Sequence, residues 1–214
     1  MLSFLVHCKD LRMRGGKAVD LNAFQIFVDH LSNLKETSID KRDGTPQYMT
    51  LSTREAVNFD GVKEEYVKPL GVSEIPKSND ALFDDGKGFL VFVEFKNGFM
   101  DRPKQFAVRK KVYDSALIFT DITSTGISYM RDHMKYILVY NETANQDNGL
   151  DEELKKKRKT AVQPSPAFDA FAKNVGKYAN EEYVCFGLKI FQNYCFKEVH
   201  TYTEAEFNAY LSSL

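Results

Sequence analysis

The chain has 214 residues, a formal net charge of −1 at pH 7, and 43% hydrophobic and 28% charged residues. These ordinary globular values predict one domain with one substantial core over residues 1–214. The near-neutral charge excludes a general basic field, so any contact with nucleic acid has to come from a local patch. No apolar run approaches the roughly 20 residues of a membrane span, which argues against a membrane partner.

The cysteines and histidines indicate neither a disulfide framework nor a zinc site. Cys8, Cys185 and Cys195 are odd in number and lack zinc-ligand spacing. The four histidines are scattered, with no paired spacing. This usage suits a reducing compartment, and we expect a cytoplasmic protein.

Toward the N-terminus, the pattern predicts a strand and two helices before residue 72. Residues 2–7 have the composition of a short strand. Asp20 is expected to cap an amphipathic helix that runs to about Leu34. Residues 52–70 mix apolar and acidic residues, and Gly71 is expected to stop a helix there.

Residues 77–97 are the stretch around which the fold is organised. Turn residues around Gly86 separate two apolar runs, which predicts a β-hairpin. The second arm, residues 89–95, is almost wholly apolar, as a strand buried on both faces would be, yet it carries Glu94 and is followed by Lys96. Charges beside such a strand are costly unless they pair or bind something.

The hairpin brings one more acid to these two charges. If it folds about Gly86, Asp80 lies opposite Phe92, and alternation along the second arm puts Asp80, Glu94 and Lys96 on one face. Two carboxylates and a lysine on a sheet face form a site for a hard cation, Mg²⁺ or Mn²⁺. The alternative is a solvated Glu94/Lys96 surface pair.

An Asp, a hairpin and then Glu-x-Lys at the end of an apolar strand resemble the PD-(D/E)xK nuclease superfamily, which has the restriction-endonuclease-like fold. The resemblance covers residues 77–97 and extends more loosely to Glu142, and Asn79 stands where the motif's name has Pro. It implies that Asp80 and Glu94 bind the metal ion together with the main-chain carbonyl of Phe95.

The same resemblance implies further roles. Lys96 would position or activate the attacking water. An acid from the helix before the hairpin often joins the metal site in that family, and a Lys or Gln from the helix after it often approaches the phosphate. The candidates for the additional acid are Glu55, Glu64 and Glu65, and those for phosphate or nucleic-acid contact are Lys77, Lys104 and Gln105.

Downstream of the hairpin, Asp101 and Pro103 begin a helix that is expected to run to about Phe119. Residues 135–140 are expected to form a buried strand parallel to 89–95, because a helix joining two strands over one face is the usual crossover. The sheet-facing side of this helix is expected to hold Phe106, Tyr113, Ala116, Leu117 and Thr120. Its basic side holds Lys104 and residues 109–111, and the solvated reading is preferred for Arg109, Lys110 and Lys111.

The C-terminal part predicts an αββα addition over residues 150–214. A self-compensating charged helix is expected over 151–159, and a helix over 167–178. Residues 183–199 favour two strands, and Thr203 with Glu206 forms a capping box for a last helix.

We therefore expect an α/β (α+β) fold with a mixed sheet flanked by helices. Its restriction-endonuclease-like core would span about residues 50–142, with residues 1–49 and 150–214 packed on it. The expected function is metal-dependent phosphodiester hydrolysis of nucleic acid, DNA in preference to RNA. The alternatives are a catalytically inactive module of the same fold that binds nucleic acid or protein, and a structural protein. Pairing into a homodimer stays open.

Overall fold

A computed structural model describes residues 19–41, 44–145 and 184–214 of the chain. Its strands are β1 (Leu31–Asn33), β2 (Ile39–Asp40), β3 (Gln47–Tyr48), β4 (Glu55–Asn58), β5 (Ala81–Asp84), β6 (Leu90–Lys96), β7 (Met134–Tyr140) and β8 (Glu198–Thr203). Its helices are η1 (Leu21–Ala23), α1 (Gln25–Asp29), α2 (Leu34–Thr37), α3 (Phe59–Val67), η2 (Lys68–Leu70), α4 (Arg102–Ile122), α5 (Ile127–His133), α6 (Glu142–Asn145), η4 (Leu188–Phe191) and α9 (Glu204–Ser212). Within these residues, no helix has the length and apolar character needed to cross a membrane.

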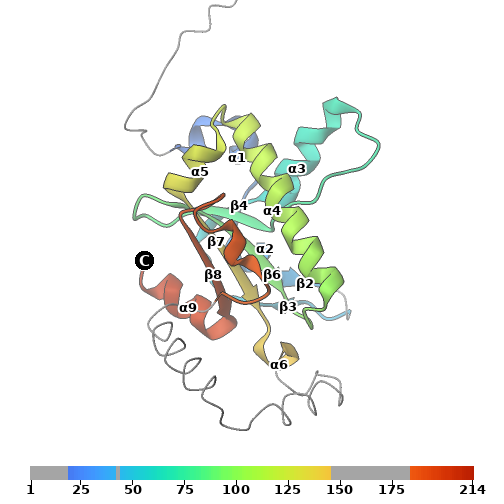
Figure 1. The fold of residues 1–214 in the computed structure, drawn as a ribbon, viewed down its shortest axis with the longest axis vertical. Helices are drawn as coiled ribbons and strands as arrows, with labels where there is room; N and C mark the ends of the chain where they lie inside the picture. Colours follow the sequence, from blue (N-terminus) through green and yellow to red (C-terminus); the bar gives the residue numbers. More distant parts are fainter. Residues whose placement is uncertain (1–18, 42–43, 146–183) are drawn as a thin grey trace, which may run out of the picture.

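One mixed sheet of six strands organises the fold, with α4 crossing it in Figure 1. The strand order is β1-β4-β5-β6-β7-β8. The four strands from β1 to β6 pair antiparallel, whereas β7 pairs parallel to both β6 and β8. The α4 helix joins β6 to β7, as a crossover between parallel strands requires. The mixed sheet flanked by helices and the parallel pairing of β7 with β6 are thus confirmed.

The β5–β6 hairpin forms as expected, with a different register. Leu82, rather than Asp80, lies opposite Phe92, so the predicted register was wrong by two residues. The reason is the loop: Asp84 pairs with Leu90, which centres the turn beyond Gly86. Because side chains alternate with a period of two, a shift of two leaves each one on its predicted face.

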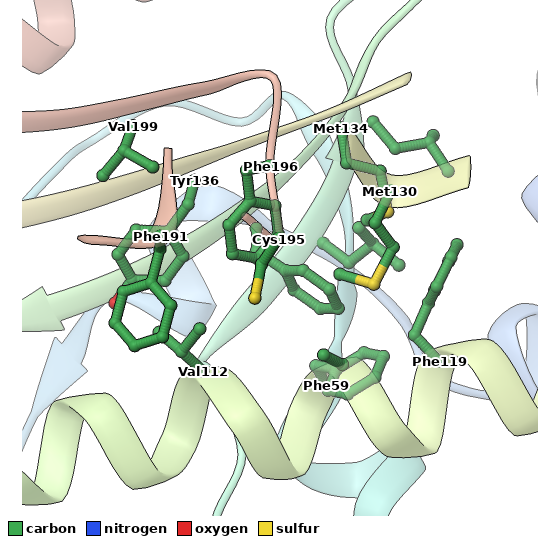
Figure 2. Packing of buried hydrophobic residues seen from close by; sticks show 14 of the residues in the cluster. Phe59, Val112, Phe119, Met130, Met134, Tyr136, Phe191, Cys195, Phe196 and Val199 are labelled. Carbon is green, nitrogen blue, oxygen red and sulfur yellow. The ribbon is translucent and has the colours of Figure 1, made fainter. Parts of the chain in front are cut away.

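Alternation along β6 separates two hydrophobic clusters. Leu90 and Phe92 pack on the α4 side, whereas Val91, Val93 and Phe95 pack on the side that holds Phe207 of α9. Figure 2 shows side chains of α4 projecting toward the sheet, among them Val112 next to Phe191 and Phe119 below Met130. Glu94 follows on the α4 side, so a carboxylate ends an otherwise apolar row.

The α4 helix begins at its predicted cap, but it packs through a different stripe. The Asp101 side chain accepts from the backbone N–H of Lys104, and Pro103 lies in the first turn. The predicted inward residues Phe106 and Leu117 are each 69% exposed, and that prediction was wrong. The buried residues are Val108, Val112, Ser115, Ala116, Ile118 and Phe119. Of these residues, only Ala116 belongs to the set that was predicted to face the sheet.

The N-terminal helix predicted from Asp20 to Leu34 is interrupted. Asp20 caps η1 through the N–H of Asn22, but α1 ends at Asp29 and Leu31–Asn33 becomes strand β1. Pairing with β4 overrides the helical periodicity, because Leu31, Ser32 and Asn33 pair with residues 57, 56 and 55 of that strand. Likewise, residues 52–70 do not form one helix, because strand β4 precedes α3. The helical part ends with η2 at Leu70, and Gly71 follows with a φ of 61°.

At the C-terminus, α9 has the predicted capping box between Thr203 and Glu206. The two strands expected over 183–199 are not found in the described part of that range, which holds η4 and turns before β8 begins at Glu198. Gly187 and Asn193 both have positive φ there, and this breaks extended pairing. β8 completes the central sheet. The predictions for 2–7, 151–159 and 167–178 lie outside the described residues.

Candidate active site

The two predicted acids meet at the C-terminal end of β6. Glu94 is fully buried, and Asp80 immediately precedes β5. The backbone N–H of Asp80 donates to the carbonyl of Val93 at 3.1 Å. In return, the N–H of Phe95 donates to Oδ2 of Asp80 at 2.6 Å. These two bonds fix Asp80 against the strand that carries Glu94.

Two lysines complete this group, which we call the β6-end cluster: Asp80, Glu94, Lys96 and Lys111. Lys96 forms a short ion pair with Oε1 of Glu94. The Nζ of Lys111, from α4, lies 2.9 Å from Oδ1 of Asp80 and 2.7 and 2.9 Å from the two carboxylate oxygens of Glu94. One ammonium therefore bridges both carboxylates, which places Asp80 and Glu94 within reach of a single cation.

The electrostatics of the cluster follow from burial. Burial raises the pKa of Glu94, and the charge of Asp80 adds to this, while Lys96 and Lys111 oppose it. For Lys111, burial favours the neutral amine, but the charges of Glu94 and Asp80 and its hydrogen bonds to them outweigh burial and raise its pKa. Lys111 is therefore a full positive charge at neutral pH.

The main-chain carbonyl of Phe95 faces the same side of β6 as its N–H, because both groups of one strand residue point toward the same neighbour. That N–H binds Asp80, and β5 begins only at Ala81, so the carbonyl is directed beyond the end of β5. The backbone oxygen that the family resemblance assigns to a metal ion is thus on the side of Asp80.

A cleft of about 430 Å³ opens beside the cluster. Asp80, Phe95 and Lys96 line it, whereas Glu94 and Lys111 lie deeper. Its other lining residues are Glu36, Thr37, Ser38, Ile39, Asp40, Met49, Asn58, Asp60 and Asn97. Four of the lining residues are carboxylates and one is a lysine, so the cleft is acidic and favours cations.

Asp60 is an acid of this cleft that the sequence did not single out. It lies in the first turn of α3, and the N–H of the preceding Phe59 donates to the carbonyl of Asp80 at 3.2 Å. Its carboxylate accepts a short hydrogen bond from Ser78 and lies 3.5 Å from Nζ of Lys63. The signal that could have found it is the N-cap at Asn58, hidden because the helix was expected to begin earlier.

The three acids proposed for an additional role lie elsewhere. Glu55 is on β4 rather than a helix and lines a separate hollow with Arg54. Glu64 and Glu65 line a third hollow, where Glu65 contacts Nε2 of His30 at 2.9 Å. None of them lines the cleft beside Asp80.

The residues expected near the phosphate are also engaged elsewhere. Nζ of Lys104 donates to the backbone carbonyl of Phe99 at 2.7 Å. The side-chain amide of Gln105 donates to the backbone carbonyl of Met100 at 2.9 Å. The backbone N–H of Lys77 donates to the carboxylate of Asp114 at 2.7 Å. The first two contacts hold the start of α4, and the third ties the segment before the hairpin to the middle of α4.

Lys111 was assigned to a solvated basic side, and that assignment was wrong. Lys110 does lie on an exposed side, paired with Asp114 at 2.6 Å. Lys111 is only 17% exposed, because it lies three residues after Val108 and four before Ser115, on the buried stripe. Reading that stripe correctly would have placed a lysine over Glu94.

Two buried groups beside the cluster complete its surroundings. The N–H of Asn79 donates to Oγ of Ser115 at 2.8 Å, a bond that the Pro of the motif's name could not make. The hydroxyl of Tyr136 is buried and has no hydrogen-bond partner in the described part of the chain. Burial, and then the charges of Glu94 and Asp80, raise the pKa of Tyr136, so it stays protonated.

Within residues 19–41, 44–145 and 184–214, no three His, Cys, Asp or Glu side chains are grouped so that they could hold a metal ion. Comparisons with protein-family models, curated proteins and solved structures return no match. The function of the site therefore has to be inferred from its own geometry.

Proposed function

We propose that this protein hydrolyses phosphodiester bonds of nucleic acid with the help of a divalent metal ion, through a PD-(D/E)xK-like site. The observation that carries the proposal is the convergence of Asp80 and Glu94 on one ammonium, at the end of a buried strand and beside an acidic cleft. Lys96 lies beside them, 24% exposed, in contact with Glu94. Two acids and a lysine on this spacing match the chemistry that the motif predicts.

The topology is compatible with the restriction-endonuclease-like core that the proposal includes. An antiparallel hairpin, a crossover helix and a parallel strand follow one another as β5, β6, α4 and β7. The helix α3 precedes the hairpin, and its first turn lies against Asp80. The acid that this helix brings to the cleft is Asp60, and we propose it in place of Glu64 or Glu65.

The donor set fits Mg²⁺ or Mn²⁺. Such ions prefer oxygen ligands, and Mg²⁺ often uses only one or two carboxylates and keeps several waters. Asp80 and Glu94 would hold the ion together with the carbonyl of Phe95. That a cation is already accepted there is shown by Lys111, whose ammonium contacts three of their oxygens. When bound, the ion would neutralise charge on the phosphate and lower the pKa of a bound water.

Lys96 is the lysine that would act on the phosphate and the water. Lys96 reaches the cleft, so its ammonium can donate hydrogen bonds to a phosphate oxygen or orient the attacking water. To deprotonate that water, Lys96 would first have to lose its own proton and act as the neutral amine. The cleft is otherwise acidic, with Glu36, Asp40 and Asp60 around it. A phosphodiester would therefore enter only when cations offset these charges, and DNA is the first substrate to test.

The test is cleavage of single- and double-stranded DNA and single-stranded RNA in Mg²⁺ or Mn²⁺. Glu94→Gln and Asp80→Asn should each lower the cleavage rate by about a hundredfold or more, because several kcal/mol of charge stabilisation depend on the ion. Glu64→Gln, in an exposed residue outside the cleft, is the matched control and should leave the rate unchanged. Full cleavage by both site variants would contradict the proposal.

One observation favours a second candidate, an inactive module of the same fold that binds nucleic acid or protein. Lys111 already satisfies both carboxylates, so the cluster is complete without a metal ion. A protein of this kind would bind no Mn²⁺ and would cut none of the supplied strands. Isothermal titration with Mn²⁺ separates it from the nuclease.

A further inference from the structure

Every carboxylate oxygen of the acid pair already has a partner from this chain. Oδ2 of Asp80 accepts from the N–H of Phe95, and Oδ1 contacts Lys111. Oε1 of Glu94 contacts both Lys96 and Lys111, and Oε2 contacts Lys111. The position between Oδ1 of Asp80 and the two oxygens of Glu94 is taken by the ammonium of Lys111, so a metal ion that bridges both acids there has to replace it.

Lys111 is the partner that can leave. The N–H of Phe95 belongs to a strand held between two others, and it cannot move without opening the sheet. The ammonium of Lys111 is at the end of a flexible four-carbon chain, and among the described residues it contacts only Asp80 and Glu94. Its side chain is partly exposed, so a path toward water exists.

The charge of the cluster favours the same exchange. Two carboxylates and two ammonium groups balance, whereas a divalent ion added to them would leave two uncompensated positive charges beside the fully buried Glu94. Buried charge without a partner is strongly unfavourable. Departure of Lys111 removes one of these charges, and the phosphate of a substrate can offset the other.

We propose that Lys111 is a built-in cation that holds the acid pair together and competes with a divalent metal ion for it. The metal ion binds as the ammonium withdraws, so Lys111 sets the affinity of the site. This inference rests on the proposed function, since it presupposes that Asp80 and Glu94 bind a metal ion.

The experiment measures Mn²⁺ binding to the full chain, by the loss of the electron paramagnetic resonance signal of free Mn²⁺ and by isothermal titration. Lys111→Met should tighten binding by roughly tenfold or more, a coupling typical of two ligands that exclude each other. Lys110→Met is the matched control: it removes the same charge from the exposed side of α4 and should leave the affinity unchanged. Adding Glu94→Gln to Lys111→Met should abolish the gain.

The outcomes separate the inference from the proposed function. Wild-type binding that Lys111→Met does not strengthen beyond Lys110→Met overturns the competition and leaves the nuclease proposal standing. Binding by Lys111→Met alone, with none by the wild type even in the presence of DNA, supports the competition and counts against the nuclease. Absence of binding in every variant removes both. If Lys111→Met does not fold, Lys111→Gln, which keeps a polar end, takes its place with the same expected direction.

Discussion

In the described part of the chain, two clusters of buried charge lie at opposite ends of β6, and the difference between them bears on the proposed function. The first is the β6-end cluster. The second, which we call the hairpin-tip cluster, contains Asp85, Lys135, Glu198 and His200. Nζ of Lys135 lies 3.4 Å from Asp85 and 3.3 Å from Glu198, and Glu198 contacts His200 at 3.2 Å. Both clusters place a fully buried carboxylate beside a lysine.

The two buried acids are held in different ways. Oδ1 of Asp85 accepts from the backbone N–H groups of Lys87 and Phe89, at 2.8 and 3.0 Å, so this carboxylate shapes the turn of the hairpin. The carboxylate of Glu94 has no such role, since among the described residues its hydrogen bonds and ion pairs are with the side chains of Lys96 and Lys111. In addition, Asp80 places a second negative charge close to it, which costs free energy unless cations are present. The proposed function therefore rests on two acids that share one cation beside a cleft, and not on buried charge alone.

The largest expected effect tests the structural role of the hairpin-tip cluster. Lys135→Met should lower the free energy of unfolding by about 3 kcal/mol, because it leaves the buried Asp85 without its ammonium. The chain has no tryptophan, so urea unfolding is best followed by circular dichroism. Lys110→Met, which removes an exposed lysine, should change the free energy of unfolding by less than about 0.5 kcal/mol. Equal losses in the two variants would mean that the hairpin-tip cluster is not structural.

The next effect concerns the β6-end cluster and depends on pH. Lys111→Met should cost about 2 kcal/mol near neutral pH, less than Lys135→Met because Lys96 still pairs with Glu94. The ammonium groups of Lys96 and Lys111 both lower the pKa of Glu94. Because the variant lacks the second of these groups, the pKa of Glu94 rises further. When folding raises the pKa of an acid, that acid stabilises the fold fully at a pH below its pKa in the unfolded chain. This contribution disappears as the pH rises through its pKa in the folded protein.

The stability difference between Lys111→Met and the wild type should therefore be largest at neutral pH and shrink as the pH falls toward 4.5, the ordinary value for Glu. Urea unfolding at several pH values measures it. A difference that grows as the pH falls would show that Lys111 does not act through the carboxylates.

The sequence was sufficient for the β6-end acids because one hairpin determines them. The strand period of two puts Asp80, Glu94 and Lys96 on one face even when the register is wrong by two residues. The turn was also correctly placed around Gly86, and Gly86 and Gly88 both have positive φ there. Local chemistry fixes each of these features, so no tertiary information was needed.

The rest of the site depends on tertiary packing that periodicity does not specify. The α4 helix has two apolar stripes, and the sequence alone did not tell that the stripe of Val108 and Val112 is buried while Phe106 is exposed. Lys111 was missed for that reason. Asp60 was missed because pairing between β1 and β4 turns residues 55–58 into a strand, which moves the start of α3 to Phe59.

A smaller effect tests how α4 is tied to the hairpin beneath the β6-end cluster. Ser115→Ala should cost about 1 kcal/mol, because the buried N–H of Asn79 loses its acceptor. Ser128→Ala, on the exposed surface of α5, should change stability by less than about 0.5 kcal/mol. Circular dichroism during urea unfolding measures both. If the Ser115 variant matches its control, the bond does not hold the two elements together.

The smallest effect has the opposite sign. The hydroxyl of Tyr136 is buried beside the β6-end cluster without a partner in the described residues, and leaving a polar group unpaired costs free energy. Tyr136→Phe removes that hydroxyl and keeps the ring, so it should raise stability by up to about 1 kcal/mol. A clear loss instead would show that water or an ion binds the hydroxyl next to Glu94. The β6-end cluster would then hold solvent at its buried side, unlike the hairpin-tip cluster, where backbone groups bind the carboxylate directly.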